Sequence, residues 1–261
     1  MGRNNRKNWI NQFIPWLIPI LVVIGWQVLT GDGVISSKIL PQPLKIVDTF
    51  IKMIKTGELI GYVITSTQRA LSGFIIGGGI GLLLGLLNGL SPSAEKLIDS
   101  SVQMIRNIPH LALIPLLILW FGIGEEVKLV LVSLGVFFPI YLNTFHGIRS
   151  IDPGLIEMGK VYGLKGFSLF WEIILPGSLA SILVGVRYAL GIMWLTLIVA
   201  ETVAANSGIG YMAMNAREFM LMDVIIVSII IYALLGKSSD IIAKKMEQRW
   251  LEWRNIKNSG W

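Results

Sequence analysis

The chain has 261 residues, of which 54% are hydrophobic and 15% are charged, with a net charge of +6. Soluble domains average about 45–50% apolar and about 25% charged residues, so this composition excludes an ordinary soluble enzyme and a disordered chain and predicts a membrane protein. The absence of cysteine excludes disulfides, thiol catalysis and cysteine metal sites, and two histidines far apart in sequence provide no metal site.

Six apolar stretches are long enough to predict membrane-spanning helices, since a helix needs about 20 mostly apolar residues to cross about 30 Å of hydrocarbon. The first is too long for the core of a signal peptide and is followed by no small-residue cleavage site. Between the first two spans, the segment from Pro41 to Lys55 predicts an amphipathic helix lying on the membrane. We place the spans roughly at residues 13–29, 63–90, 108–123, 127–148, 174–200 and 223–243.

Charge predicts the orientation of these spans. With the N-terminus inside, most Lys and Arg residues outside the spans fall on the cytoplasmic side, as the positive-inside rule requires. The predicted fold is therefore all-α and polytopic, with six transmembrane helices and both termini in the cytoplasm. We divide the chain into an N-terminal part at 1–62, a transmembrane core at 63–248 and a cytoplasmic tail at 249–261.

The second predicted span carries a glycine at every fourth position. Such a row lies on one face of a helix and allows a second helix to approach closely, so we interpret it as a packing seam, with a hinge as the alternative. The row consists of Gly73, Gly77, Gly81, Gly85 and Gly89.

No motif predicts a nucleotide site or a hydrolase site in this chain. No strand precedes the glycines of the second span, and Gly236-Lys237-Ser238 lacks the upstream glycine of a phosphate-binding loop. Lys237 is instead expected to reach the inner interface, near Asp240. Neither H-E-x-x-H nor G-x-S-x-G occurs. We therefore expect no enzyme, with an intramembrane enzyme or a free-standing channel as the alternative from a different class.

The polar interval at 151–176 predicts two short helices on the cytoplasmic face. Asp152 can cap the first, with Pro153 at the favoured first position, and Gly163 can end it. Ser168 is the expected cap of the second helix, and Pro176 is expected to begin the fifth span. A compact helix–glycine–helix that neither spans the membrane nor is disordered predicts a docking element for a soluble partner.

This interval resembles the EAA loop of permease subunits of ATP-binding-cassette (ABC) importers. That loop has Glu, then Gly six residues later, then Ile-x-Leu-Pro after nine more. Met158 and Gly159 replace the two alanines that follow the glutamate in the family. The residues that fit the spacing are Glu157, Gly163, Ile173, Leu175 and Pro176.

The resemblance extends over about residues 15–250. The segments Arg106–Leu116, Trp194–Thr202 and Ala205–Glu218 are similar to the nitrate, sulfonate, taurine and bicarbonate branch, and most of all to its aliphatic sulfonate permeases. This implies alternating access for an aliphatic sulfonate, with taurine, nitrate, bicarbonate or a pyrimidine precursor as alternatives.

The resemblance also implies the fold and the assembly. The fold is that of a type I importer permease in the bacterial cytoplasmic (inner) membrane. The partners are a second permease copy, two cytoplasmic ATPase subunits that bind ATP and Mg, an external substrate-binding protein and membrane lipid, with no nucleic acid. The chain itself would hold no cofactor or metal. The residues assigned to ATPase coupling are Glu157, Gly163, Leu164, Lys165, Gly166, Phe167 and Pro176.

Polar side chains inside the predicted spans are candidates for the path of an anionic substrate. Arg187 is the best placed, about 16 Å into the fifth span, and the alternative is that it pairs with Glu201 or with backbone carbonyls. Arg69 and Glu201 are expected at helix ends, where they snorkel or pair. The glycine-interrupted segment 206–218 is either a gate or a platform for the binding protein. The pathway candidates are Arg187, Glu201, His110 and Asn143.

Overall fold

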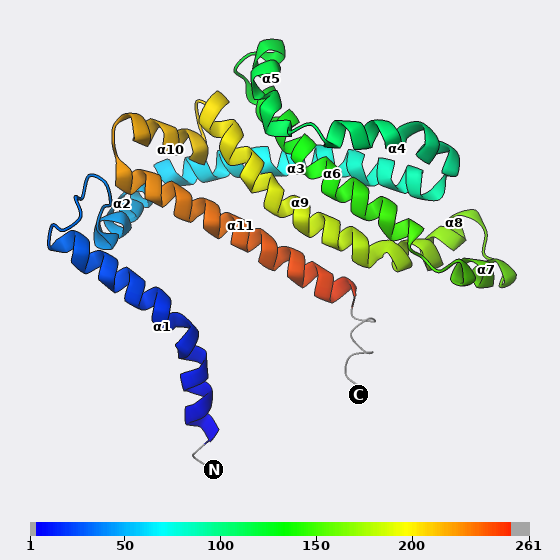
Figure 1. The fold of residues 1–261 in the computed structure, drawn as a ribbon, viewed down its shortest axis with the longest axis horizontal. Coiled ribbons are helices and arrows are strands. Elements are labelled where there is room, and N and C mark those ends of the chain that lie inside the picture. Colours follow the sequence, from blue (N-terminus) through cyan, green and yellow to red (C-terminus); the bar gives the residue numbers. More distant parts are fainter. Residues whose placement is uncertain (1–3, 252–261) are drawn as a thin grey trace. The chain divides into compact units, whose positions relative to one another are not determined.

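The computed structural model describes residues 4–251, with side chains from residue 17 onward, and its elements in that range are all helical. The prediction of an all-α chain is thus confirmed. In order, the helices are α1 (Asn4–Gly31), α2 (Pro43–Lys55), α3 (Glu58–Leu90), α4 (Pro92–Arg106), α5 (Ile114–Phe121), α6 (Glu125–Arg149), α7 (Pro153–Val161), α8 (Gly166–Leu169), α9 (Leu175–Ala204), α10 (Ile209–Glu218) and α11 (Met222–Trp250) (Figure 1).

The chain forms two compact units. The first contains the described residues up to Gly61 together with Met212–Ile230, and the second contains Tyr62–Tyr211 together with the described residues from Ile231 onward. The division into 1–62, 63–248 and 249–261 stays a prediction. Residues 252–261 of the predicted tail lie outside the described part.

In the first unit, two polar contacts tie the segments together. The indole N–H of Trp26 in α1 donates to the carbonyl oxygen of Pro41 at 3.1 Å, and the hydroxyl of Thr49 in α2 donates to the carboxylate of Asp223 at 2.7 Å. The expected amphipathic helix is confirmed as α2. One of its faces exposes a row of apolar side chains, as a helix lying on a membrane would: Leu44, Val47, Ile51 and Ile54.

Four helices in the described part are long and apolar enough to cross a membrane, or five if α4 and the segment after it form one bent span. The four are α3, α6, α9 with the turns before it, and α11. The first predicted span, at 13–29, lies within α1, whose described apolar part Leu17–Gly31 is shorter than a span. The count of six therefore stays a prediction.

The predicted third span at 108–123 is wrong as a single helix. A 3₁₀ turn at His110–Leu113 and the short α5 replace it, and this pair is bent by 79° from α4. Pro109 lies at the break: it has no backbone N–H to donate and its ring disfavours helical geometry at the residue before it. The amphipathic helix α4 was not predicted, although Ser91 caps it by accepting a hydrogen bond from the N–H of Ala94.

In the second unit α6 is the central helix, and it lies side by side with α9 (Figure 1). The two helices approach so closely that a methyl group would not fit at three glycines between them: Gly135 and Gly147 on α6 and Gly185 on α9. On α3, every glycine of the predicted row faces α6: a Cβ at Gly73 would lie 2.6 Å from a methyl of Val132, and one at Gly81 would lie 2.6 Å from the carbonyl oxygen of Phe137. This geometry supports a packing role for the row.

Candidate functional site

The interval at 151–176 folds as two short helices joined by a glycine. The side chain of Asp152 accepts a hydrogen bond from the N–H of Gly154 at 2.8 Å and caps α7. At the other end Gly163 has a φ of +86°, which favours glycine. The N–H of Gly163 bonds to the carbonyl of Lys160 and that of Leu164 to the carbonyl of Gly159, which is the Schellman pattern of a helix end.

The second short helix, α8, begins earlier than predicted. Ser168 is not its cap: it lies in the first turn, where its hydroxyl accepts from the N–H of Lys165 at 3.2 Å. A π-helical turn at Phe170–Ile174 joins α8 to α9, so residues 166–204 run as one continuous helical stretch. Within it Pro176 lies in the first turn of α9, where the fifth span was predicted to begin. The wide turn has a physical reason, since a proline at 176 would otherwise clash with the carbonyl four residues earlier.

Apolar side chains are exposed on and beside both short helices and on the π-helical turn that follows, and Glu157 on α7 is exposed as well. The rings of Phe167 and Trp171 meet edge to face with centroids 5.8 Å apart. An exposed apolar cluster on a polar loop is typical of a surface that binds a partner. Its members are Leu155, Met158, Val161, Tyr162, Phe167 and Trp171.

Gly159 explains one departure from the EAA pattern. It is buried, and a Cβ there would overlap the side chain of Ile173, which belongs to the π-helical turn. The missing methyl group lets α7 pack closely on the π-helical turn that precedes α9. The departure is therefore compatible with the loop's shape.

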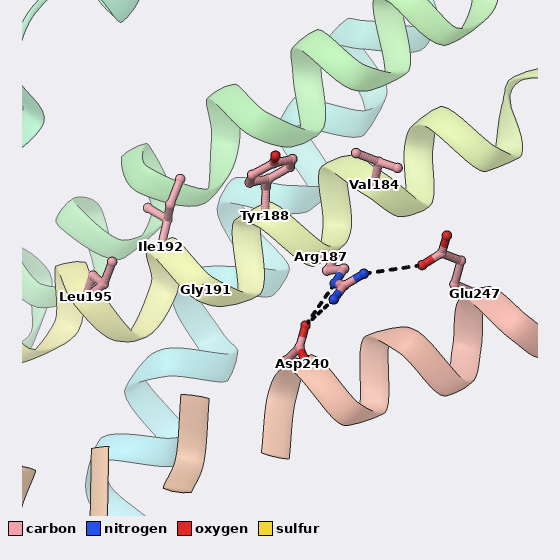
Figure 2. A pocket seen from close by; sticks show the side chains of 8 residues that line it. All are labelled: Val184, Arg187, Tyr188, Gly191, Ile192, Leu195, Asp240 and Glu247. Atoms are coloured by element: carbon pink, nitrogen blue, oxygen red, sulfur yellow. Dashed lines mark hydrogen bonds and ion pairs between the residues drawn. The ribbon is translucent and has the colours of Figure 1, made fainter. Parts of the chain in front are cut away.

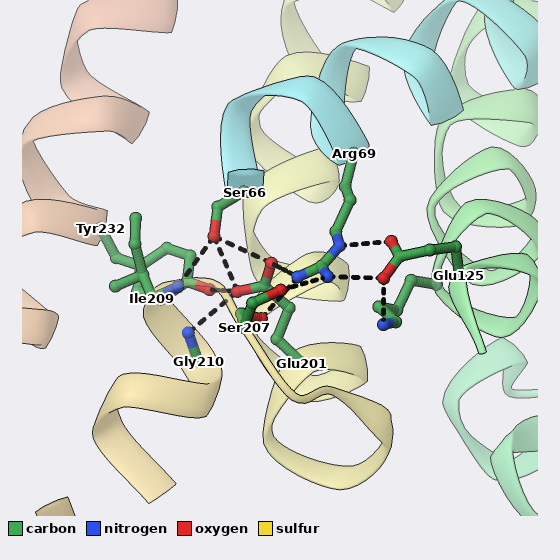
Figure 3. Close-up of polar contacts among 9 residues, drawn as sticks. Ser66, Arg69, Glu125, Glu201, Ser207, Ile209, Gly210 and Tyr232 are labelled. Carbon is green, nitrogen blue, oxygen red and sulfur yellow. Dashed lines mark hydrogen bonds and ion pairs between the residues drawn. The ribbon is translucent and has the colours of Figure 1, made fainter. Parts of the chain in front are cut away.

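Arg69 on α3 is buried, with 5% of its surface exposed, and each of its five N–H groups has an acceptor (Figure 3). Nε and Nη2 donate to the carboxylate of Glu125 at 2.5 and 2.6 Å. Nη1 donates to Glu201 at 2.8 Å and to the carbonyl of Ser207 at 2.6 Å, and Nη2 also donates to the Ser207 hydroxyl at 2.8 Å. The expected pairing of Arg69 is confirmed, and the guanidinium has no donor left for a ligand.

Glu201, near the end of α9, is the other buried ion of this network, with 1% of its surface exposed. Its carboxylate also accepts from the hydroxyl of Ser66 at 2.8 Å, from the N–H of Gly210 at 2.9 Å and from the hydroxyl of Tyr232 at 2.9 Å. The network therefore links α3, α6, α9, α10 and α11 at one place (Figure 3).

Arg187 on α9 lies in a different environment (Figure 2). Its Nε and Nη2 lie 2.8 Å from a carboxylate oxygen of Asp240 on α11, and its Nη1 lies 3.9 Å from Glu247. The side chain is 45% exposed and borders a cavity of about 560 Å³. The alternative that Arg187 pairs with Glu201 is wrong, whereas the expected approach of Lys237 to Asp240 is found, at 3.6 Å.

The cavity beside Arg187 has apolar walls. They come from one face of α9, where the lining side chains recur at helical spacing. The acids Asp240 and Glu247 close its other side. The walls consist of Val184, Tyr188, Gly191, Ile192 and Leu195.

The four pathway candidates do not gather in one site. His110 lies 3.3 Å from the hydroxyl of Thr196, and Asn143 donates to the carbonyl of Pro139 on its own helix at 2.8 Å. Sequence reasoning missed the partners of both arginines. For Arg187 a signal existed, because Asp240 and Glu247 are seven residues apart and thus share one face of α11.

A sequence profile of the family described as "Binding-protein-dependent transport system inner membrane component" matches residues 77–252. The chain belongs to this family. The permease is 57% identical over 95% of its length to the putative aliphatic sulfonates transport permease protein SsuC of Escherichia coli (strain K12), of which 94% is covered. It is 46% identical over 92% of its length to the protein of that name in Bacillus subtilis (strain 168), of which 87% is covered.

Solved structures agree on the fold. The permease matches a crystal structure of "an amino acid ABC transporter with histidines" with a TM-score of 0.59 and 19% identity, over 77% of this chain and 98% of that chain. The permease is thus a multi-pass membrane protein of an ABC transporter family whose members are not themselves enzymes. A free-standing channel or an intramembrane enzyme is not favoured.

Proposed function

We propose that this permease is the membrane subunit of an ATP-driven importer of aliphatic sulfonates. The observation that carries the substrate is the 57% identity, across nearly the whole chain, to a permease named for aliphatic sulfonates. The assembly would be two permease copies, two cytoplasmic ATPase subunits that hold ATP and Mg, and an external binding protein. We place it in the bacterial cytoplasmic membrane, with six spans per copy and both termini inside.

The coupling role goes to the two short helices at 151–176. Their exposed apolar side chains suit a groove on the ATPase, and the coupling residues Glu157, Gly163, Leu164, Lys165, Gly166 and Phe167 lie on or beside this surface. Because α8 continues through the π-helical turn and Pro176 into α9, closure of the ATPases would move α9 directly. That movement would alternate access to the cavity along α9.

We place the substrate beside Arg187. A sulfonate stays ionised and has an apolar tail, so it requires a cationic donor next to an apolar wall. The cavity offers both, with a planar guanidinium fork at one side and Val184, Tyr188 and Leu195 along α9. Glu201, whose carboxylate oxygens already accept hydrogen bonds, is assigned to stabilising the helices. His110 is assigned to a contact between helices and Asn143 to a contact within its own helix.

Growth on single sulfur sources tests this function. A strain lacking the permease should grow on sulfate but fail on an aliphatic sulfonate such as butanesulfonate, and the cloned gene should restore that growth. Normal growth of the deletion strain on every sulfonate, with failure on taurine, nitrate or bicarbonate alone, would overturn the substrate.

We expect Gly163→Val to uncouple the permease from its ATPase. A β-branched residue at a φ of +86° is strained by about 1–2 kcal/mol, which opens the turn between α7 and α8 while leaving the spans intact. Permease level, co-purified ATPase and uptake should be measured together, and the last two should fall while the first is kept. Gly163→Asn is the control, since asparagine tolerates positive φ and should retain more of both. Normal ATPase recovery and uptake with valine would remove this role from the loop.

A further inference from the structure

We propose that α11 carries a built-in competitor for the substrate: Asp240, supported by Glu247, holds the guanidinium of Arg187 between transport events and yields it to the sulfonate during each cycle. The proposal rests on the proposed function and adds a specificity-determining pair to it. The contact that carries it is the approach of Asp240 to both Nε and Nη2 at 2.8 Å, on the border of the cavity (Figure 2).

The two intramembrane arginines differ in whether an anion can reach them. Arg69 is buried and uses all five donors: two on Glu125, one on Glu201 and two on Ser207. Arg187 is 45% exposed, and among the described residues it has hydrogen-bond contacts to Asp240 alone, because the 3.9 Å to Glu247 is too long for one. An anion entering the cavity therefore finds unused N–H groups on Arg187 and none on Arg69.

Displacing Asp240 from Arg187 costs little free energy, because Asp240 keeps a second cationic neighbour. The other oxygen of Asp240 lies 3.6 Å from the ammonium group of Lys237, one turn earlier on the same helix. When Asp240 gives up Arg187 it therefore remains paired, and it is 38% exposed, so that water also solvates it. An unpaired carboxylate in an apolar site would be far more costly.

The exchange also balances charge and selects the ligand. One monovalent carboxylate leaves Arg187 and one monovalent sulfonate takes its place, so the charge of the site next to the guanidinium is unchanged. A small inorganic anion gains only the ionic contact. An alkyl sulfonate also covers the apolar walls on α9, and at about 25 cal/mol per Å² of buried apolar surface this favours the organic anion over its inorganic competitors.

Binding to the complete permease–ATPase complex in lipid nanodiscs, without binding protein or nucleotide, tests the competitor. Radiolabelled butanesulfonate should bind Asp240→Asn about 2- to 5-fold more tightly than wild type, the size of a partly exposed ion pair, while maximal uptake falls because the anion is no longer displaced. In an Arg187→Gln background the same change should have no effect on binding. If the pair were only structural, Asp240→Asn would change the amount of complex, and butanesulfonate binding would show no Asp240 effect that depends on Arg187.

Two outcomes distinguish failure of the competitor from failure of the proposed function. If wild-type complexes bind and import butanesulfonate but Asp240→Asn leaves the Kd and maximal rate unchanged, the competitor is overturned and the function stands. If the wild type imports no sulfonate, the function itself fails. Should Asp240→Asn not assemble, Glu247→Gln applies the same test with an expected tightening of about 2-fold, and an unchanged Kd there overturns the proposal.

Discussion

Replacing Arg69 by methionine will remove most of the permease from the membrane. The change leaves the carboxylate of Glu201, which is 1% exposed, without its guanidinium and frees Glu125 and Ser207 from their shared donor. Breaking a buried ion pair from one side costs about 3–5 kcal/mol, which is a large part of the stability of a typical domain. Permease level in isolated membranes and the Tm of purified complexes measure the effect.

Arg187→Met is the matched control, because it makes the same substitution in the other intramembrane arginine. That side chain is 45% exposed, so its loss should leave the level of permease near that of wild type while sulfonate uptake is lost. Arg69→Lys should be intermediate, since an ammonium keeps the charge but supplies three donors in place of five. Equal losses of protein for both methionine variants would contradict the distinction between a structural and a transport arginine.

Local signals made the loop at 151–176 predictable. Asp152 followed by Pro153 is a helix start that depends on adjacent residues, and Gly163 ends the helix because the chain needs a positive φ there. The same holds for α2, because its apolar face and its charged face are both evident within one short segment of sequence. The misplaced start of α8 came from the same rule: Ser168 can cap a helix or lie in its first turn, and the backbone of Lys165 decided between them.

Partnerships between distant residues could not be predicted in this way. Arg69 and Glu201 are 132 residues apart, and no local pattern indicates that a third ion, Glu125, shares the guanidinium. For Arg187 the sequence offered Glu201 or backbone carbonyls only as the alternative to a pathway role, whereas the structure brings Asp240 of α11 to it. Tertiary contacts choose among several oppositely charged groups that the sequence leaves equivalent.

The glycine row on α3 leads to the second strong effect, which we expect for Gly81→Leu. A Cβ at this position would lie 2.6 Å from the carbonyl oxygen of Phe137, so a leucine forces the backbones of α3 and α6 apart. Overpacking typically costs about 1–3 kcal/mol, and we expect the upper end here because backbone cannot move aside as a flexible side chain can. The permease level in membranes and the yield of complex with its ATPase should both collapse.

Gly79, two residues away on the same helix, is the control that separates packing from flexibility. A Cβ at Gly79 meets nothing within 4 Å, so Gly79→Leu should leave the complex intact. Alanine sharpens the comparison: Gly79→Ala should stabilise the permease by up to about 1 kcal/mol, through helix propensity, whereas Gly81→Ala should destabilise it despite the same gain. A hinge predicts a different result, since stiffening either position would then leave stable complexes that fail to transport. Opposite shifts in Tm for alanine at two positions only two residues apart would assign the row to packing against α6.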